Sequence, residues 1–277
     1  MSPLVRYDVR ERVAIITIDN PPVNALSHGV PEGISEAVAR AGSDAGADAI
    51  VLIGSGQTFI AGADINVFKT LETREQSLER SEAIHTRLKQ IEDVGKPLVA
   101  AIRGHALGGG LEFAMACHYR VAVASARVGQ PEVALGIIPG AGGTQRLPRL
   151  CEATTALELC TEGRPIAAAR ALAEGIIDQV VDGNLLEGAM AFAAARAIAG
   201  GNRRTRDLRP RIADRAAALA ACDATRASLA KAARGARAPF AAVEAIEAAL
   251  TRDFETGSSV ERELFANCVI STESRAL

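Results

Sequence analysis

Two glutamates, Glu112 and Glu132, each lie beside a glycine-rich stretch of this chain. Glu112 follows the glycine triplet of residues 108–110, and Glu132 precedes the glycines of residues 136–143. Glycine lets another molecule approach the backbone closely, and a carboxylate in a poorly hydrated pocket can act as a general acid or base. The two glutamates are 20 positions apart in the sequence, so they are candidates for a single acid–base centre.

The glycine triplet is expected to begin a buried helix. A β-rich run at residues 98–102 leads through it into LEFAMAC at residues 111–117, where Glu112 is the one charged residue. Peptide N–H groups at a helix start have no intrahelical partner and carry the positive end of the helix dipole, so they can bind an oxygen that gains negative charge. The triplet is therefore a candidate oxyanion site.

A second donor for such a site would have to come from another segment, and residues 59–65, with the sequence FIAGADI, are the best candidate. No large side chain at Ala61, Gly62 or Ala63 would keep a ligand away from the backbone N–H groups. The same local pattern also fits a tight turn followed by a helix that Asp64 caps. The local pattern leaves both interpretations open.

The elements that would position these residues alternate between strand and helix in the first part of the chain. Apolar β-rich runs occupy residues 13–18, 49–53, 98–102, 120–124 and 176–181, and helical stretches are expected at 29–41, 72–94, 109–118, 151–161 and 165–174. From about residue 185 the β signal ends, and helices are expected at 184–199, 207–234, 239–254 and 258–275. We predict an α/β fold with an all-helical C-terminal extension.

The overall composition excludes several function classes. The 277 residues are 48% hydrophobic and 23% charged, with a net charge of −2, which is ordinary for a globular protein. This charge gives no reason to expect binding to nucleic acid or to an anionic membrane. No stretch reaches the ~18 apolar residues of a membrane span, and the N-terminus lacks the apolar core of a signal peptide. We expect a cytoplasmic location.

The cysteines and glycine loops argue against bound metals and nucleotide cofactors. Five scattered cysteines without a CxxC pair do not form a disulfide framework, and no histidine stands at metal-ligand spacing. The third glycine of a GxGxxG fingerprint that begins at Gly54 would fall on Phe59, and no glycine loop is followed by GK[ST]. The basic cluster at residues 203–211 is read as a solvated hinge, with contact to an anionic ligand or a partner as the alternatives.

Three long motifs together resemble the enoyl-CoA hydratase/isomerase (crotonase) family. They are FIAGAD at residues 59–64, GHALGGGLE at 104–112 and QPEVALGIIPGAGGTQRL at 130–147, in the family's order. The resemblance implies a crotonase-like core, a spiral of ββα units, over residues 1–200. It implies that residues 201–277 form a helical region covering the active site.

Further segments resemble one branch of that family, the hydratase/isomerase half of multifunctional β-oxidation enzymes. These segments are NPPVNALS at residues 20–27, ACHYR at 116–120 and the tail from residue 238 to 277. In that branch a 3-hydroxyacyl-CoA dehydrogenase with its own NAD fingerprint follows, so a dehydrogenase half is expected if the natural chain is longer. Simple crotonases are commonly trimers, whereas the multifunctional relatives cover the site within one chain, which leaves a trimer and a monomer both open.

The resemblance implies a role for each site residue. Ala63 and Gly109 match the two oxyanion-hole positions, whose N–H groups hold a thioester oxygen as it gains enolate charge. Glu112 matches the residue that orients and deprotonates the attacking water, and Glu132 the residue that delivers a proton to C2. A backbone N–H near Gly140 helps to hold the water.

The substrate implied is an acyl-CoA thioester, and no cofactor is expected, because coenzyme A is part of the substrate. The coenzyme A contacts are expected on two segments, at Val23, Ala25, Leu26, Ala61, Asp64 and Ile65. The expected activity is hydration of 2-enoyl-CoA in fatty-acid β-oxidation with accessory 3,2-enoyl-CoA isomerisation. The alternatives are other CoA-thioester chemistry on the same fold, and a non-catalytic or RNA-binding relative.

Overall fold

The computed structural model describes residues 2–211, 214–232 and 236–276, and the chain divides into two compact units. The first unit comprises the chain up to Asp64 together with Thr86–Val128 and Ile166–Thr205. The second comprises Ile65–His85, Gly129–Pro165 and the chain from Arg206 onward. The expected boundary at residue 200 stays a prediction. That the helical region covers an active site stays a prediction.

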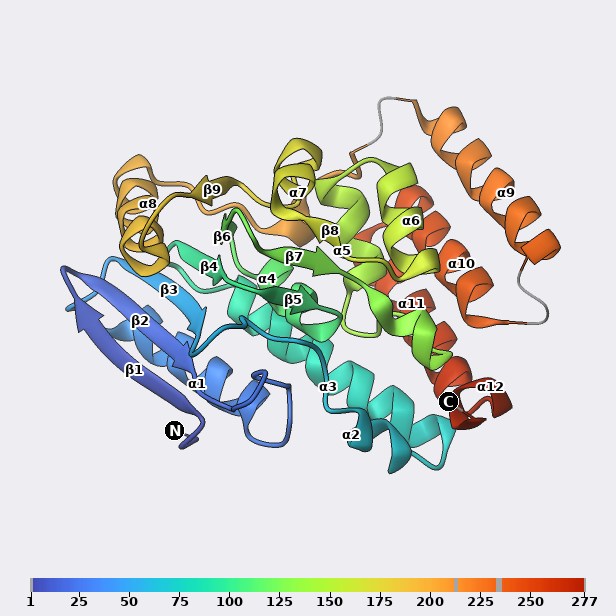
Figure 1. Ribbon diagram of the computed structural model, residues 1–277, viewed down its shortest axis with the longest axis horizontal. Helices are drawn as coiled ribbons and strands as arrows, with labels where there is room; N and C mark the ends of the chain where they lie inside the picture. The colour runs from blue at the N-terminus through green and yellow to red at the C-terminus, as the bar shows by residue number, and fades with distance from the viewer. Residues whose placement is uncertain (1, 212–213, 233–235, 277) are drawn as a thin grey trace. The chain divides into compact units, whose positions relative to one another are not determined.

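A six-stranded sheet forms the centre of the first unit (Figure 1). Its first two strands are antiparallel, and all later neighbours are parallel. In spatial order the strands are β1 (Val5–Arg10), β2 (Val13–Ile18), β3 (Ala49–Gly54), β4 (Leu98–Ile102), β6 (Tyr119–Val123) and β9 (Gln179–Val181). The alternating α/β pattern predicted for this part of the chain is confirmed.

The central strands are buried on both faces, which explains why their sequences are continuous apolar runs rather than alternating ones. Helix α8 (Leu185–Ala199) covers one face of the sheet with Leu185, Ala189 and Ala193. The side chain of Asn184 caps this helix by accepting from the N–H groups of Leu186 and Glu187. The small side chains of α8 let the helix lie close to the strands.

Shorter elements complete the first unit around the sheet. A second sheet holds three strands of two or three residues in the order β5, β7 and β8. The remaining elements are α1 (Val30–Ser43), β5 (His105–Leu107), α4 (Gly109–Ala116), β7 (Arg127–Gly129), β8 (Ile166–Ala167) and α7 (Ala168–Glu174). Helix α4 follows β5 directly, so the glycine triplet lies at a strand-to-helix junction.

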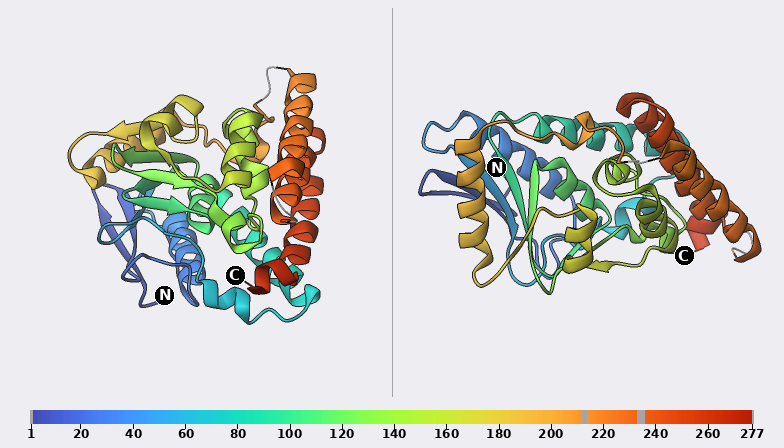
Figure 2. Two further views of the ribbon diagram at one scale, coloured as in Figure 1. Left: turned by 45° about the vertical axis from the view of Figure 1, so that its right-hand side comes forward. Right: turned by 90° about the horizontal axis from the view of Figure 1, so that it is seen from above.

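The second unit consists of helices packed around α10 (Ala238–Thr251), which contacts α5, α6, α9 and α11. Figure 2 shows α9, α10 and α11 side by side. The other helices are α2 (Ile65–Lys69), α3 (Arg74–Glu92, which continues into the first unit), α5 (Gly143–Leu150), α6 (Ala153–Glu162), α9 (Arg215–Ala232), α11 (Phe254–Val269) and α12 (Thr272–Ala276), with 3₁₀ turns at Pro131–Leu135 and at Thr205–Asp207, which begins in the first unit. The predicted helical C-terminal region is confirmed.

Helix boundaries in the C-terminal region differ from the expected ones because of local caps. The helix expected at 207–234 begins at Arg215, where Asp214 accepts from the N–H groups of Ala216 and Ala217. Residues 212–213 and 233–234 of that expectation lie outside the described residues. Asp253 accepts from the Thr256 N–H and begins α11 four residues earlier than expected. An aspartate N-cap therefore sets the start of both α9 and α11.

The basic cluster contains arginines that pair with carboxylates of the chain. Arg203 lies 2.6 Å from Asp178, and Arg204 lies 2.9 Å from Asp93. Arg203 also stands over the ring of Tyr119, 5.3 Å from its centroid. These contacts give both arginines a structural role in the first unit.

No helix in the described part of the chain is long and apolar enough to cross a membrane. All five cysteines are buried, and burial raises the pKa of the Cys117 thiol to about 12. Among the described residues no group of three or more histidine, cysteine, aspartate or glutamate side chains could hold a metal ion.

His118 links α3 to the start of β4 inside the first unit. Its Nδ1 accepts from the Leu98 N–H at 3.0 Å, and its Nε2 lies 3.0 Å from the Glu92 carbonyl oxygen. This pairing requires a neutral ring with the proton on Nε2, because Nδ1 must accept. Burial holds the pKa of His118 below its usual value.

We therefore expect the free energy of unfolding to fall as the pH drops below about 6.5, the pKa of histidine in the unfolded chain. The unfolded chain binds a proton at His118 in this range and the folded chain does not, so acid favours unfolding. Urea unfolding at pH 7.5 and 5.5 should give a smaller difference for His118→Gln than for the wild type. His28→Gln, at an exposed position, should keep the wild-type difference. Equal pH dependence in wild type and His118→Gln would contradict the assignment.

Candidate active site

The three glycines before Glu112 differ in what would oppose a side chain at each position. Gly108, the residue before α4, has a φ of 52°, which disfavours residues with a side chain. A Cβ atom at Gly110 would lie 2.2 Å from the carbonyl oxygen of Ile60, so only glycine fits there. Neither constraint applies at Gly109. The groups nearest to it are the Leu26 side chain, the Ala63 amide nitrogen and the Glu112 carboxylate.

Backbone hydrogen bonds tie the segment that carries Ala63 to β5, the strand before the glycine triplet. The Ile60 N–H donates to the carbonyl of His105, and the Leu107 N–H donates to the carbonyl of Ile60, each at 3.1 Å. These bonds run beside β5, the strand that ends one residue before Gly108. They fix the small-residue turn against the start of α4.

Gly109 lies beside both the second expected donor and the first glutamate. A Cβ atom at Gly109 would stand 3.9 Å from the Ala63 amide nitrogen and 3.9 Å from Oε2 of Glu112. It would also stand 2.8 Å from Cδ1 of Leu26, an apolar wall at the same place. The structure thus brings together four of the predicted site residues within the first unit, namely Leu26, Ala63, Gly109 and Glu112.

Glu112 is buried, with 3% of its surface exposed, so it is not a surface charge. Its backbone N–H closes the first turn of α4 by donating to the carbonyl of Gly108 at 3.0 Å. All its neighbours in α4 from Gly110 to Ala116 are buried as well. A carboxylate in the first turn of a buried helix is favoured by the helix dipole. The helix therefore holds this carboxylate in an apolar setting beside Gly109.

The two segments expected to contact coenzyme A are joined to each other. The Ala61 N–H donates to the carbonyl of Val23 at 3.1 Å, and the Leu26 N–H donates to the carbonyl of Gly62 at 2.9 Å. The carbonyl of Ala25 accepts from the side chain of Asn20. The N–H groups of Ala61 and Leu26 are thus engaged within the protein, so a ligand at these segments would use other groups.

Two of the expected coenzyme A positions present apolar surface. Val23 is 41% exposed, and Ile65, the first residue of the second unit, is 49% exposed. Asp64 is half-buried at the end of the first unit. The segment 59–65 therefore ends in a half-buried acidic residue and an exposed apolar one.

Glu132 belongs to the second unit, on the 3₁₀ turn Pro131–Leu135, and is half-buried. The turn ends at Gly136, which has a φ of 67° and donates to the carbonyls of Glu132 and Val133. A Cβ atom at Gly136 would lie 2.9 Å from the backbone nitrogen of Ser274 in α12. Helix α12 therefore packs closely against the end of the turn that carries Glu132.

Gly140 is packed against an aromatic ring of the C-terminal region. A Cβ atom there would lie 2.5 to 2.7 Å from three ring atoms of Phe265, so only glycine allows this contact. The carbonyl oxygen of Gly140 accepts from Oγ of Ser81 at 2.7 Å. Phe265 in turn meets the ring of Phe68 edge-on, with centroids 6.1 Å apart.

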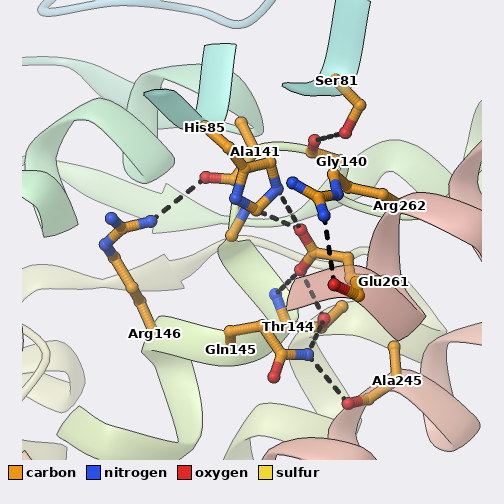
Figure 3. Close-up of polar contacts among 12 residues, drawn as sticks. Ser81, His85, Gly140, Ala141, Thr144, Gln145, Arg146, Ala245, Glu261 and Arg262 are labelled. Carbon is orange, nitrogen blue, oxygen red and sulfur yellow. Dashed lines mark hydrogen bonds and ion pairs between the residues drawn. The ribbon is translucent and has the colours of Figure 1, made fainter. Parts of the chain in front are cut away.

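Sequence reasoning missed the polar residues Ser81 and Glu261, which bond to the loop that begins at Gly140 (Figure 3). Glu261 accepts from the N–H groups of Gly142 and Thr144. These partners are separated by 59 positions for Ser81 and by up to 119 for Glu261. No local pattern in the sequence connects them.

Comparison with known proteins agrees with this fold. The solved structure of enoyl-CoA hydratase from Bacillus anthracis is 29% identical to this chain, with a TM-score of 0.66, and the match covers 97% of this chain and 92% of that one. The fold is the crotonase fold, as predicted. The sequence model of the enoyl-CoA hydratase/isomerase family matches residues 8–216, and the chain belongs to this family.

Curated relatives of two kinds are similar to this chain. The peroxisomal bifunctional enzyme of Danio rerio is 46% identical over 191 residues, which cover 69% of this chain and 26% of that protein. The probable enoyl-CoA hydratase of Bacillus subtilis is 45% identical over 169 residues, which cover 61% of this chain and 66% of that protein. The match therefore spans about a quarter of the first relative and less than two thirds of the second.

Proposed function

We propose that this protein hydrates 2-enoyl-CoA thioesters, adding water across the C2=C3 bond. The observation that carries the proposal is the arrangement around Gly109, where the Ala63 amide nitrogen and the carboxylate of the buried Glu112 each lie 3.9 Å from the position of a Gly109 Cβ atom. The names of the relatives, an enoyl-CoA hydratase and a bifunctional enzyme, support the same substrate class.

The backbone N–H groups of Ala63 and Gly109 would stabilise the substrate's thioester oxygen. Attack of water at C3 moves electron density onto this oxygen as an enolate forms. Donors held in place by the fold need no rearrangement when the charge develops, and losing one such donor typically costs about 2.7 to 4 kcal/mol of transition-state stabilisation. The side chains at these positions matter by being small, since they leave the amides accessible.

The two glutamates divide the proton transfers of the reaction. Glu112 takes a proton from the water that attacks C3, and Glu132 delivers a proton to C2. A backbone N–H near Gly140 helps to hold the water. In the reverse, dehydrating direction the two roles exchange. The chemistry needs no cofactor besides the coenzyme A that the substrate carries.

The same residues permit an accessory isomerase activity. Glu132 would take a proton from C2 of a 3-enoyl-CoA and return it at C4, which moves the double bond from C3=C4 to C2=C3, while the oxyanion donors hold the dienolate. This reaction uses no water, so it does not need the water-activating role of Glu112. Retention of both glutamates favours hydration as the main activity.

A place in fatty-acid β-oxidation and a dehydrogenase half in a longer natural chain are part of the proposal. Relatives with the names peroxisomal bifunctional enzyme and fatty acid beta-oxidation multifunctional protein support both. The product of hydration, a 3-hydroxyacyl-CoA, is the substrate that a 3-hydroxyacyl-CoA dehydrogenase would take.

The direct test is to add crotonyl-CoA to the purified protein and follow the absorbance of the conjugated thioester. We expect the absorbance to fall as water adds, with an active enoyl-CoA hydratase as the positive control. Mass spectrometry of the product should show a gain of one water. Absence of turnover beside an active control would refute the proposal, and free coenzyme A as the product would favour thioester hydrolysis instead.

A further inference from the structure

Glu261 is a fully buried carboxylate in α11, in the C-terminal region of the second unit. Its side chain enters the loop that connects Gly140 to α5 (Figure 3). A buried carboxylate costs several kcal/mol of desolvation, which an apolar side chain of similar volume would avoid. A charge at this position therefore has to be explained by the bonds it makes.

The carboxylate accepts hydrogen bonds from several groups of the loop. Oε1 accepts from the Gly142 N–H at 2.6 Å, and Oε2 accepts from the Thr144 N–H at 2.9 Å. Oε2 also accepts from the hydroxyl of Thr144. Both N–H groups stand at the start of α5, where Gly142 is the N-cap and has no side chain to cap the helix. Glu261 supplies that cap from α11.

His85 in α3 completes the surroundings of the carboxylate. Its Nε2 lies 3.1 Å from Oε1 of Glu261, and both side chains are buried. Because a carboxylate only accepts, Nε2 carries the proton and donates. The carboxylate therefore joins α3, α11 and the start of α5 at one point.

The other end of the loop is held in a similar way. Oγ of Ser81, one turn before His85 in α3, donates to the carbonyl of Gly140 at 2.7 Å. The ring of Phe265, one turn after Glu261 in α11, packs on Gly140. Ser81 and Phe265 thus contact the loop at Gly140, and Glu261, which is bonded to His85, holds it at Gly142 and Thr144.

We propose that Glu261 is a positioning residue, which holds the 140–144 loop so that its backbone N–H near Gly140 can bind the attacking water. The proposal rests on the proposed hydratase function. Because Glu261 contacts groups of the protein, helix α11 takes part in catalysis indirectly, through the loop. The consequence is selective: hydration depends on the water and on this loop, whereas isomerisation involves no water.

The first test is Glu261→Gln. Glutamine keeps the volume, but its amide group replaces one accepting oxygen by a donor that would face N–H groups of the loop or of His85. We expect kcat for crotonyl-CoA hydration to fall about 10- to 100-fold, the order of loss that a small misplacement of a reacting group causes. We expect KM to change less than about twofold and 3-enoyl-CoA isomerisation less than about threefold, on the same scale.

The matched control is Glu263→Gln, two positions further along α11. Glu263 forms an ion pair with Arg74 and is 51% exposed, so this variant removes a charged contact of the same helix without touching the loop. Both activities should stay at the wild-type level. Equal losses of hydration and isomerisation in Glu261→Gln, or no loss of hydration, would overturn the proposal.

A second pair of variants keeps the test decisive if Glu261→Gln does not fold. Ser81→Ala removes the bond to Gly140, and Ser77→Ala removes a hydroxyl one turn earlier that donates to Thr73 in its own segment. Ser81→Ala should lower hydration about 3- to 10-fold, the scale of one hydrogen bond, and isomerisation much less, whereas Ser77→Ala should change neither. Unchanged hydration in Ser81→Ala, or loss of both reactions alike, would contradict the proposal.

The outcome for the wild type separates this inference from the proposed function. If the wild-type protein hydrates no enoyl-CoA, the proposed function fails and the positioning role fails with it. If the wild type hydrates enoyl-CoA and the Glu261 and Ser81 variants keep the wild-type ratio of the two activities, only the positioning role fails.

Discussion

Glu132→Gln is expected to lower both hydration and isomerisation by about 10²- to 10⁴-fold in kcat, the usual contribution of a positioned acid or base. In the proposed mechanism Glu132 delivers the proton to C2 in hydration and carries the proton between C4 and C2 in isomerisation. A glutamine cannot carry that proton in either reaction. Binding should change little, because glutamine keeps the size of the side chain and the 3₁₀ turn is fixed through Gly136.

The measurement is steady-state kinetics with crotonyl-CoA and with a 3-enoyl-CoA, together with the dissociation constant of a non-reactive acyl-CoA. Glu162→Gln is a suitable control in the same unit, because Glu162 is half exposed and pairs only loosely with Arg164, 3.8 Å away. An unchanged isomerase rate in Glu132→Gln would refute the assignment of the proton shuttle.

The sequence predicted those strands that are continuous apolar runs, and missed β1 and the short strands β5, β7 and β8, which are not. β1 has an alternating burial pattern, and it pairs with β2 through a turn at Glu11 and Arg12, both of which have positive φ. Tight hairpin turns of this kind usually carry asparagine or glycine, so the Glu-Arg pair gave no turn signal. β1 forms because it pairs with β2, so this strand depends on a contact with another strand rather than on a local sequence signal.

α5 was also missed, for a reason that concerns the site. This helix contains Pro148, buries every one of its eight residues and starts at a glycine that cannot cap it. Its cap comes from Glu261, more than 100 positions away in the sequence. A helix whose start depends on a distant carboxylate has no local signature, so neither the helix nor the role of Glu261 could be predicted.

The site residues of the first unit could be named from the sequence, because they lie on motifs of the family. Their arrangement needed the structure, since the approach of Ala63 to Gly109 depends on bonds between Ile60 and the strand before the triplet. The structure also shows a detail that motifs do not contain, namely that the Ala61 and Leu26 N–H groups already bond within the protein. Motifs identify residues, and pairing decides which of their atoms remain for a ligand.

Glu112→Gln is expected to separate the two activities. The proposed role of Glu112 is to activate water, so kcat for hydration should fall about 10²- to 10³-fold, as for loss of a general base. Isomerisation, which uses no water, should fall less than about tenfold on the same scale. Folding should be preserved, because glutamine has nearly the same shape and fits the buried position in α4 where Glu112 is 3% exposed.

The control for this variant has to remove a buried carboxylate that has no assigned role in the reaction. Glu92, at the end of α3 in the first unit, is fully buried, and Glu92→Gln should leave the ratio of the two activities at the wild-type value. Both reactions should be measured on the same preparation, with circular dichroism to compare the folded fraction. Equal losses of hydration and isomerisation in Glu112→Gln would contradict the division of labour, because they would mean that Glu112 supports the shared enolate step rather than the water.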